Sequence, residues 1–153
     1  MILAVPFALA LLTMAAAPIS DTRISKADAR HVFMQFQEKG RLFDPAEADL
    51  HCENGAIRMY REDASGAVKK SEGPAAPYKQ ILREGVQEAR RANDYSKFSK
   101  VTYHPDGDNI RIESTRYSVL RKYKSPATFL IGKCASGEIG ILLMIIHLKP
   151  AAT

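Results

Sequence analysis

The sequence contains no tryptophan, only two cysteines and no charged residue before Asp21. Hydrophobic residues make up 46% of the 153 positions and aromatic residues 8%, a balance that excludes collagen-like and disordered chains. Because the first charge is at Asp21, the formal net charge of +5 falls entirely on the stretch that begins there. A chain of this length is expected to form one domain that buries roughly two-thirds of its unfolded surface, so its core needs no metal or disulfide.

No hydrophobic run reaches the length of an ordinary transmembrane helix. The longest, Ile2 to Ala17, is uncharged but is shorter than the roughly twenty residues that span a bilayer, and Pro6 weakens it further. Its length and the small residues Ala15 to Ala17 are typical of a secretory signal peptide. Residues 1–19 are therefore predicted to be a signal peptide, and residues 20–153 the single domain of a periplasmic or secreted protein with no membrane span. The alternative is an uncleaved anchor or a buried N-terminal helix.

The two cysteines are Cys52 and Cys134. In an oxidising compartment such a pair can form a disulfide, and the alternative is two buried thiols. Neither cysteine has the CxxC or histidine spacing of a zinc site, so no metal is predicted. The sequence also lacks the P-loop, GxGxxG, GxSxG and HExxH motifs, and no cofactor is predicted.

Helical periodicity predicts two long helices. The first runs from Ser25 to Lys39 and has an apolar face composed of Ala29, Val32, Phe33 and Phe36. Ser25, with Asp28 three residues later, resembles a capping box at its start. The second runs from Tyr78 to Ala92 and has an apolar stripe composed of Tyr78, Ile81, Leu82, Gly85, Val86 and Ala89. We expect this stripe to pack in the core. Between the two helices, Asp44-Pro45 is typical of the start of a short helix, and Ala56 to Ser71 predicts a hairpin.

From Phe98 onwards the chain has the alternating pattern of strands. Phe98 to His104 and Asn109 to Leu120 are predicted to form a hairpin in which His104 lies opposite Asn109. In that register Val101 faces Ile112 on the apolar side, and the other side is polar, as a half-buried sheet requires.

The second strand of this hairpin can extend to Tyr123, which is too long for a straight strand. A bulge is therefore predicted near Ser114 to Ser118. A further hairpin joins Ala127 to Cys134 with Ile139 to Leu148. The last strand is apolar on both faces, and a strand of this kind has each of its two faces buried by another element. We expect helices on one side and a second copy of the chain on the other.

The order of these elements resembles the nuclear transport factor 2-like superfamily, also called ketosteroid-isomerase-like or SnoaL-like, over residues 24–149. Five features carry the resemblance: the Asp44-Pro45 helix start, strand Ala56 to Glu62, helix Tyr78 to Ala92, the hairpin at Tyr103 to Asp108, and the closing strand Ile139 to Leu148. The resemblance implies an α+β, cystatin-like fold: a cone-shaped, curved antiparallel sheet wrapped around about three helices. It also implies a pocket at the open end of the cone and a homodimer formed through the sheet. The family includes isomerases, dehydratases, epoxide hydrolases and non-catalytic binding proteins.

Candidate ligand-binding residues follow from the alternation of the long strand. If the alternation continues without a bulge, the core face extends through Ser99, Ser114, Arg116 and Ser118, polar residues that suit a pocket. Arg116 would then bind a carboxylate or another anion. The alternative is that the bulge reverses the phase, so that Tyr117 and Val119 point inward and Arg116 is solvated. Tyr60 is a further candidate, because its hydroxyl could donate to a ligand oxygen.

His147 and Tyr103 are the candidates for catalysis, because imidazole titrates near neutrality and tyrosine can donate a proton. A histidine at the end of an apolar strand more often has a structural role. The catalytic carboxylate of the family's enzymes has no counterpart here, since the acidic residues lie in turns and at helix starts such as Asp44 and Glu47. The sequence therefore favours a non-catalytic module that binds a protein or a small anionic or apolar ligand over a lyase, isomerase or hydrolase. The basic residues are scattered, so no nucleic-acid partner is predicted.

Overall fold

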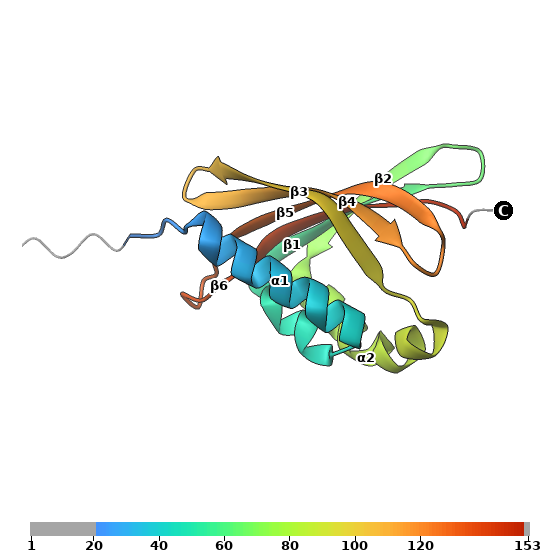
Figure 1. Ribbon diagram of the computed structural model, residues 1–153, viewed down its shortest axis with the longest axis horizontal. Coiled ribbons are helices and arrows are strands. Elements are labelled where there is room, and N and C mark those ends of the chain that lie inside the picture. The colour runs from blue at the N-terminus through green and yellow to red at the C-terminus, as the bar shows by residue number, and fades with distance from the viewer. Residues whose placement is uncertain (1–20, 152–153) are drawn as a thin grey trace, which may run out of the picture.

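The computed structural model describes residues 21–151, which form one curved sheet with helices against one of its faces (Figure 1). In chain order the elements are α1 (Lys26–Leu42), the 3₁₀ helix η1 (Pro45–Leu50), β1 (His51–Glu62), β2 (Val68–Pro74), α2 (Ala75–Ala92), β3 (Ser96–Asp106), β4 (Asn109–Ser118), β5 (Tyr123–Lys133) and β6 (Ile139–Leu148). The predicted α+β fold class is confirmed. The predicted signal peptide lies outside the described residues. Within them, no helix has the length and apolar character needed to cross a membrane.

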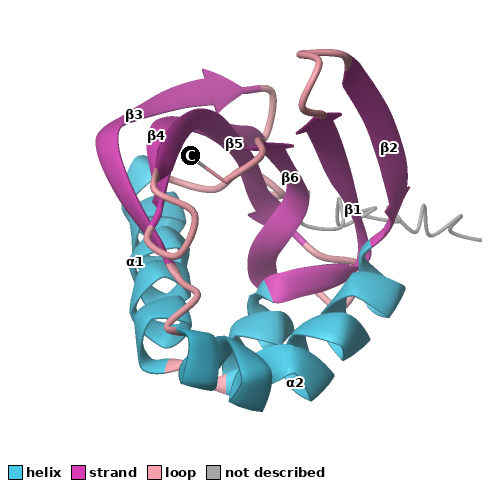
Figure 2. Ribbon diagram, turned by 90° about the vertical axis from the view of Figure 1, so that its right-hand side faces the viewer, coloured by secondary structure: helices cyan, strands magenta, loops and turns pink. Residues whose placement is uncertain are grey.

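The six strands form a single sheet in the order β2-β1-β6-β5-β4-β3. Every neighbouring pair is antiparallel except β1 and β6, which run parallel. The prediction of a wholly antiparallel sheet is corrected at this pair. The long strands twist strongly, and the sheet arches around α1 and α2 (Figure 2). The parallel pair places the first and last strands side by side, so the sheet depends on contacts that are remote in sequence.

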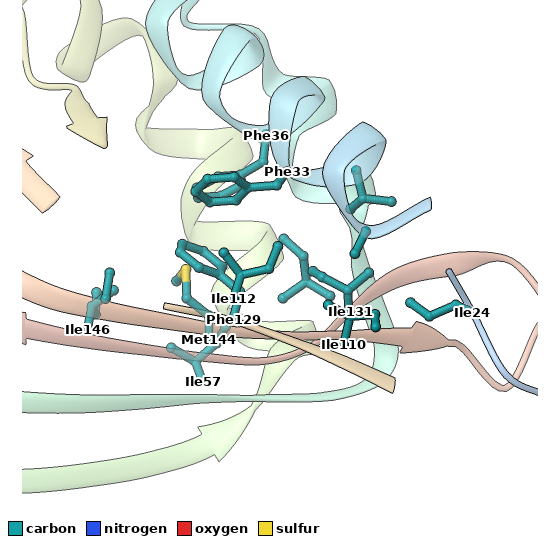
Figure 3. Close-up of a cluster of buried hydrophobic side chains, with 14 residues drawn as sticks. Ile24, Phe33, Phe36, Ile57, Ile110, Ile112, Phe129, Ile131, Met144 and Ile146 are labelled. Atoms are coloured by element: carbon teal, nitrogen blue, oxygen red, sulfur yellow. The ribbon is translucent and has the colours of Figure 1, made fainter. Parts of the chain in front are cut away.

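Helix α1 begins with the predicted cap. The backbone N–H of Asp28 donates to Ser25 Oγ at 3.0 Å, and the N–H of Ser25 donates to the Asp28 carboxylate at 2.8 Å. The face of α1 that the periodicity predicts is the one that is buried. Phe33 and Phe36 point down onto the sheet, where their ring centroids lie 5.0 and 5.1 Å from that of Phe129 (Figure 3). The aromatic contacts between α1 and the sheet form the centre of the core.

The register of the β3–β4 hairpin differs from the prediction by two residues. Asp106 lies opposite Asn109, so the turn consists of Gly107 and Asp108, and Tyr103 rather than Val101 faces Ile112. Gly107 has a φ of 60° at the first position of the turn, as a type II′ turn requires. Asp106-Gly107 and Gly107-Asp108 are both acceptable turn pairs, so local sequence does not separate the two registers. A shift of two residues preserves the faces, because side chains alternate with a period of two.

The bulge lies in β3 and not in β4, which corrects the predicted position. Pairing shifts between Ser99 and Thr102, where Lys100 has a φ of 51°. β4 pairs regularly with β5 and ends at Ser118. β3 is an edge strand, where a bulge disrupts a single ladder. The bulge reverses the phase of the first half of β3, so Phe98 packs on the core and Ser99 is exposed.

Cys52 and Cys134 are joined by a disulfide with Cα atoms 5.2 Å apart. The bond connects the start of β1 with the chain just after β5. It closes a covalent loop between residues 82 apart in sequence. A cross-link over such a separation restricts the unfolded chain strongly. The pairing of β1 with β6, two strands that are remote in sequence, is thus supported by a covalent bond nearby.

Candidate functional site

A pocket of about 300 Å³ lies between the helices and the concave face of the sheet. Its apolar lining from α2 is the stripe Tyr78, Ile81, Leu82, Gly85, Val86 and Ala89, and the core contributes Phe36, Phe98, Phe129, Met144 and Ile146. Helix α2 packs mainly on β1 and η1, so its apolar stripe borders a cavity and is not buried in the core as predicted. Ile81 is 64% exposed. The volume is at the lower end of the range for small-molecule sites.

Arg116 is the predicted site residue that reaches this pocket. It shares the inner face of β4 with Ile112, so the alternative phase, with Tyr117 and Val119 inward, does not occur. The Nε of Arg116 donates to Ser96 Oγ at 2.8 Å, and its Nη1 donates to the Tyr123 hydroxyl at 3.2 Å. Neither partner is a carboxylate. Arg116 is therefore held in position with its charge uncompensated by any carboxylate within 4.0 Å in the described part of the chain.

The other predicted ligand-binding residues do not line the pocket. Ser114 lies on the inner face, but its hydroxyl donates to the Ala127 carbonyl at 3.2 Å. Ser99 and Tyr117 point to the convex face, because the residues that precede or follow them, Phe98 and Arg116, point inward. Of the two alternatives for this strand, the one without a bulge places Arg116 and Ser114 on the inner face, as observed, and the bulge in β3 removes Ser99 from that face.

The two candidates for catalysis also lie away from the pocket. His147 and Tyr60 stack on each other with centroids 4.8 Å apart. They are on the convex face, since their neighbours Ile146 and Met59 point inward. Tyr103 does point inward, but its ring lies 5.8 Å from the Arg30 guanidinium near the start of α1. None of the three can act on a molecule in the pocket.

Sequence reasoning missed Glu47, which lines the pocket. Asp44 caps η1 by accepting from the Ala46 N–H at 2.9 Å, and Glu47 lies three residues later, one 3₁₀ turn along the same side. A Cβ built on Gly40 would lie 3.4 Å from Glu47 Oε2, so the glycine leaves room for the carboxyl against α1. Burial, followed by the Asp44 carboxylate, raises the pKa of Glu47 to about 7. The sequence signal that could have identified Glu47 is its position three residues after Asp44, which places both side chains on the same side of a 3₁₀ helix.

Tyr78 brings a third polar group to the same pocket. Burial is the main cause that raises the pKa of its hydroxyl, the Glu47 carboxylate raises it further, and Arg116 acts in the opposite direction. Tyr78 therefore remains a neutral hydrogen-bond donor at physiological pH. A carboxyl that titrates near neutrality, a phenol and a guanidinium together can bind an oxygen atom of a ligand or move a proton to and from it.

His51 lies behind the pocket wall. Its ring packs edge-on against Phe36 and Tyr78, with centroids 6.0 and 5.5 Å apart, and it is only 2% exposed. Burial, followed by the charge of Lys79, lowers the pKa of His51 to about 4. Lys79 is itself buried and pairs with Glu53. His51 is thus a neutral part of the packing. Within residues 21–151, no group of three or more His, Cys, Asp or Glu side chains is arranged to hold a metal ion.

No family model matches the chain, and no curated protein matches it by sequence. Solved structures do match it. A nuclear transport factor 2-like protein with a cystatin-like fold from Novosphingobium aromaticivorans superposes with a TM-score of 0.53 at 12% identity, over 80% of this chain and 80% of that chain. The chain has a nuclear transport factor 2-like fold.

Two further structural neighbours have suggested activities. A protein of this family from Streptomyces avermitilis, for which a dehydratase activity has been suggested, matches at 14% identity with a TM-score of 0.51, covering 83% of this chain and 96% of that chain. A protein from Shewanella frigidimarina, for which a ketosteroid isomerase activity has been suggested, matches at 15% identity with a TM-score of 0.50, covering 78% and 94%. At such identities the likeness establishes the fold alone.

Proposed function

We propose that this nuclear transport factor 2-like chain binds a small, largely apolar molecule in the pocket and orients it by an oxygen atom that contacts Arg116. The observation that supports this most is Arg116 itself, a cation held by Ser96 and Tyr123 in the wall of a mainly apolar cavity. In partly dry surroundings a fixed guanidinium attracts an anionic or carbonyl oxygen more strongly than it does in water. Glu47 and Tyr78 supply further hydrogen-bonding groups.

A glycine in α2 offers a way to test the pocket without disturbing the fold. Gly85 lines the cavity, and a Cβ built on it would meet no atom within 4 Å. Gly85→Leu should therefore fill the pocket, while Gly85→Ala leaves most of it open and serves as the matched control. We expect 2-naphthoate to bind to the natural chain and to Gly85→Ala in calorimetric titrations, and Gly85→Leu to lose the binding. Equal binding by all three would refute the proposal.

A second candidate function, proton transfer, is favoured by Glu47. A carboxyl with a pKa of about 7 is suited to accept and return a proton at neutral pH. Tyr78 and Arg116 in the same pocket could stabilise an oxyanion that forms next to the proton-donating carbon. This is the type of chemistry expected of an isomerase or lyase, the activities suggested for two of the structural neighbours.

The test of proton transfer is deuterium exchange. In D₂O the chain should accelerate exchange at the α-carbon of 2-tetralone, an apolar ketone, as followed by NMR. Glu47→Gln should slow that exchange by about 10²-fold or more while 2-tetralone still binds. Exchange at the rate of buffer alone, or unchanged exchange in Glu47→Gln, would leave ligand binding as the function.

We also propose that the protein works in the periplasm or outside the cell, and as a homodimer. The disulfide between Cys52 and Cys134 supports an oxidising compartment. On the convex face of the sheet, Leu130, Leu143 and Ile145 are only partly buried, and a second copy would cover them. Ile145→Lys should then convert a dimer into a monomer in sedimentation velocity. A natural chain that sediments as a monomer would refute the dimer.

A further inference from the structure

Arg116 borders two cavities. Arg116 and Asp94 line both the apolar pocket and a second depression of about 300 Å³. The second depression lies where β1, β4 and β6 end, and Figure 1 shows the β1–β2 hairpin, the β4–β5 turn and the C-terminal end together at one side of the molecule. We call it the basic depression. A molecule that passes Arg116 could therefore occupy both spaces.

The basic depression carries an excess of positive charge. Four cationic side chains line it, Arg61, Arg116, Arg121 and Lys149, against the two carboxylates of Glu62 and Asp94. In the described part of the chain none of these four cations forms a salt bridge. Unpaired cations that converge on a concave surface attract an anion, and two surplus positive charges match a dianion.

Arginines elsewhere on the sheet are paired. Arg58 contacts Glu72 at 2.8 Å, and Arg111 contacts Glu113 at 3.1 Å. The absence of such partners around the basic depression is thus not a general property of the arginines on this sheet.

Buried hydroxyl groups support the depression. Ser118 is 1% exposed, and its Oγ accepts from the backbone N–H of Arg121 at 3.2 Å, which fixes the turn that carries Arg121. The Tyr123 hydroxyl accepts from Arg116, so its own hydrogen remains available to a ligand. Ser125 lies opposite Arg116 in the sheet, is 4% exposed, and its Oγ has no partner among the described residues. The Tyr123 hydroxyl is therefore a donor beside Arg116 that the fold itself does not use, whereas Ser125 lines neither cavity.

We infer that the ligand is a phosphate monoester of an apolar alcohol. Its phosphate occupies the basic depression beside Arg61, Arg121 and Lys149, its apolar part fills the pocket, and Arg116 contacts the junction between them. This inference rests on the proposed binding function and specifies the chemical class of the ligand. A phosphate dianion accepts several charge-assisted hydrogen bonds at once, which a monoanionic carboxylate does less well.

Calorimetric titration with four probes tests the inference. The probes are 2-naphthol, 2-naphthoate, 2-naphthyl phosphate and inorganic phosphate, at constant ionic strength. We expect 2-naphthyl phosphate to bind most tightly, and the double variant Arg121→Gln/Lys149→Gln to weaken it about tenfold while 2-naphthol binds as before. Lys26→Gln removes an exposed cation that lines neither the pocket nor the basic depression and should change nothing.

The outcomes separate the two proposals. If 2-naphthol and 2-naphthoate bind but the phosphate ester binds no more tightly than 2-naphthoate, the inference is wrong and the binding function stands. The inference is also overturned if Lys26→Gln weakens the ester as much as the double variant, or if inorganic phosphate binds as tightly as the ester. If no naphthalene probe binds, both proposals fail.

Discussion

The two long helices show similar periodicity but border different spaces. The apolar face of α1 packs on the sheet, with Phe33 only 1% exposed against the aromatic rings. The apolar stripe of α2 encloses a cavity, and polar groups from η1 and β4 share that cavity. The comparison teaches that amphipathicity fixes which face of a helix turns inward. The distance between the helix and the sheet decides whether that face becomes core or a binding site.

The largest difference in stability is expected between two variants in which one apolar side chain is truncated to alanine, one in α1 and one in α2. Phe33→Ala should lower the free energy of unfolding by about 3–5 kcal/mol, because it opens a cavity in a packed core. Leu82→Ala should lower it by about 1 kcal/mol or less, since Leu82 already faces open space. Urea unfolding measures both. Similar losses at the two positions would mean that the pocket is closed in solution and that the two halves of the molecule do not differ.

A smaller effect is expected at His51. Its ring lies between Phe36 of α1, the helix that packs on the sheet, and Tyr78 of α2, the helix that borders the pocket. Its pKa is about 4 in the folded chain, below the usual value of 6.5, so the unfolded chain binds the proton more readily. The contribution of His51 to the free energy of unfolding is therefore fully present above about pH 6.5. It is lost as the pH is lowered from there to about 4, and the total loss is about 3 kcal/mol.

The measurement is the free energy of unfolding at several pH values between 4 and 7. His51→Leu should remove the part of the pH dependence that belongs to this group, and His31→Gln, at an exposed position, should retain it. The difference between each variant and the natural chain isolates the group from the carboxylates that titrate in the same range. A pH dependence that His51→Leu leaves unaltered would show that the imidazole is not buried against the pocket wall.

Local signals predicted the elements of the fold, and tertiary contacts decided the site. The capping box at Ser25 depends on neighbours in sequence and is confirmed. The alternation of β4 left two alternatives open, and the structure has the one without a bulge, in which Arg116 points inward. The bulge at Lys100 has no glycine to mark it, so the reversal of Ser99 could not be read from the pattern. Glu47 looks like an ordinary residue of a first helical turn. Its raised pKa arises only because η1 packs its carboxyl against α1.

The smallest expected effects come from two glycines and have opposite signs. Gly85→Ala, in the open half, adds a methyl group to free space and removes backbone freedom from the unfolded chain, so it should stabilise the fold by up to about 1 kcal/mol. Gly140→Ala, in the closed sheet, would place a Cβ 2.8 Å from both the Leu50 carbonyl oxygen and Cys134 Sγ, and should destabilise by about 1–3 kcal/mol.

Thermal unfolding of the two glycine variants, with calorimetric enthalpies, would measure how the same added methyl group changes stability beside the pocket, at Gly85, and within the sheet, at Gly140. The cavity beside α2 explains the sign at Gly85, because only open space lets a methyl group be added to a helix face without displacing another atom. If Gly85→Ala lowered the melting temperature as Gly140→Ala does, the α2 stripe would have to be packed after all. Arg116, Glu47 and Tyr78 would then lack the space in which they could meet a ligand.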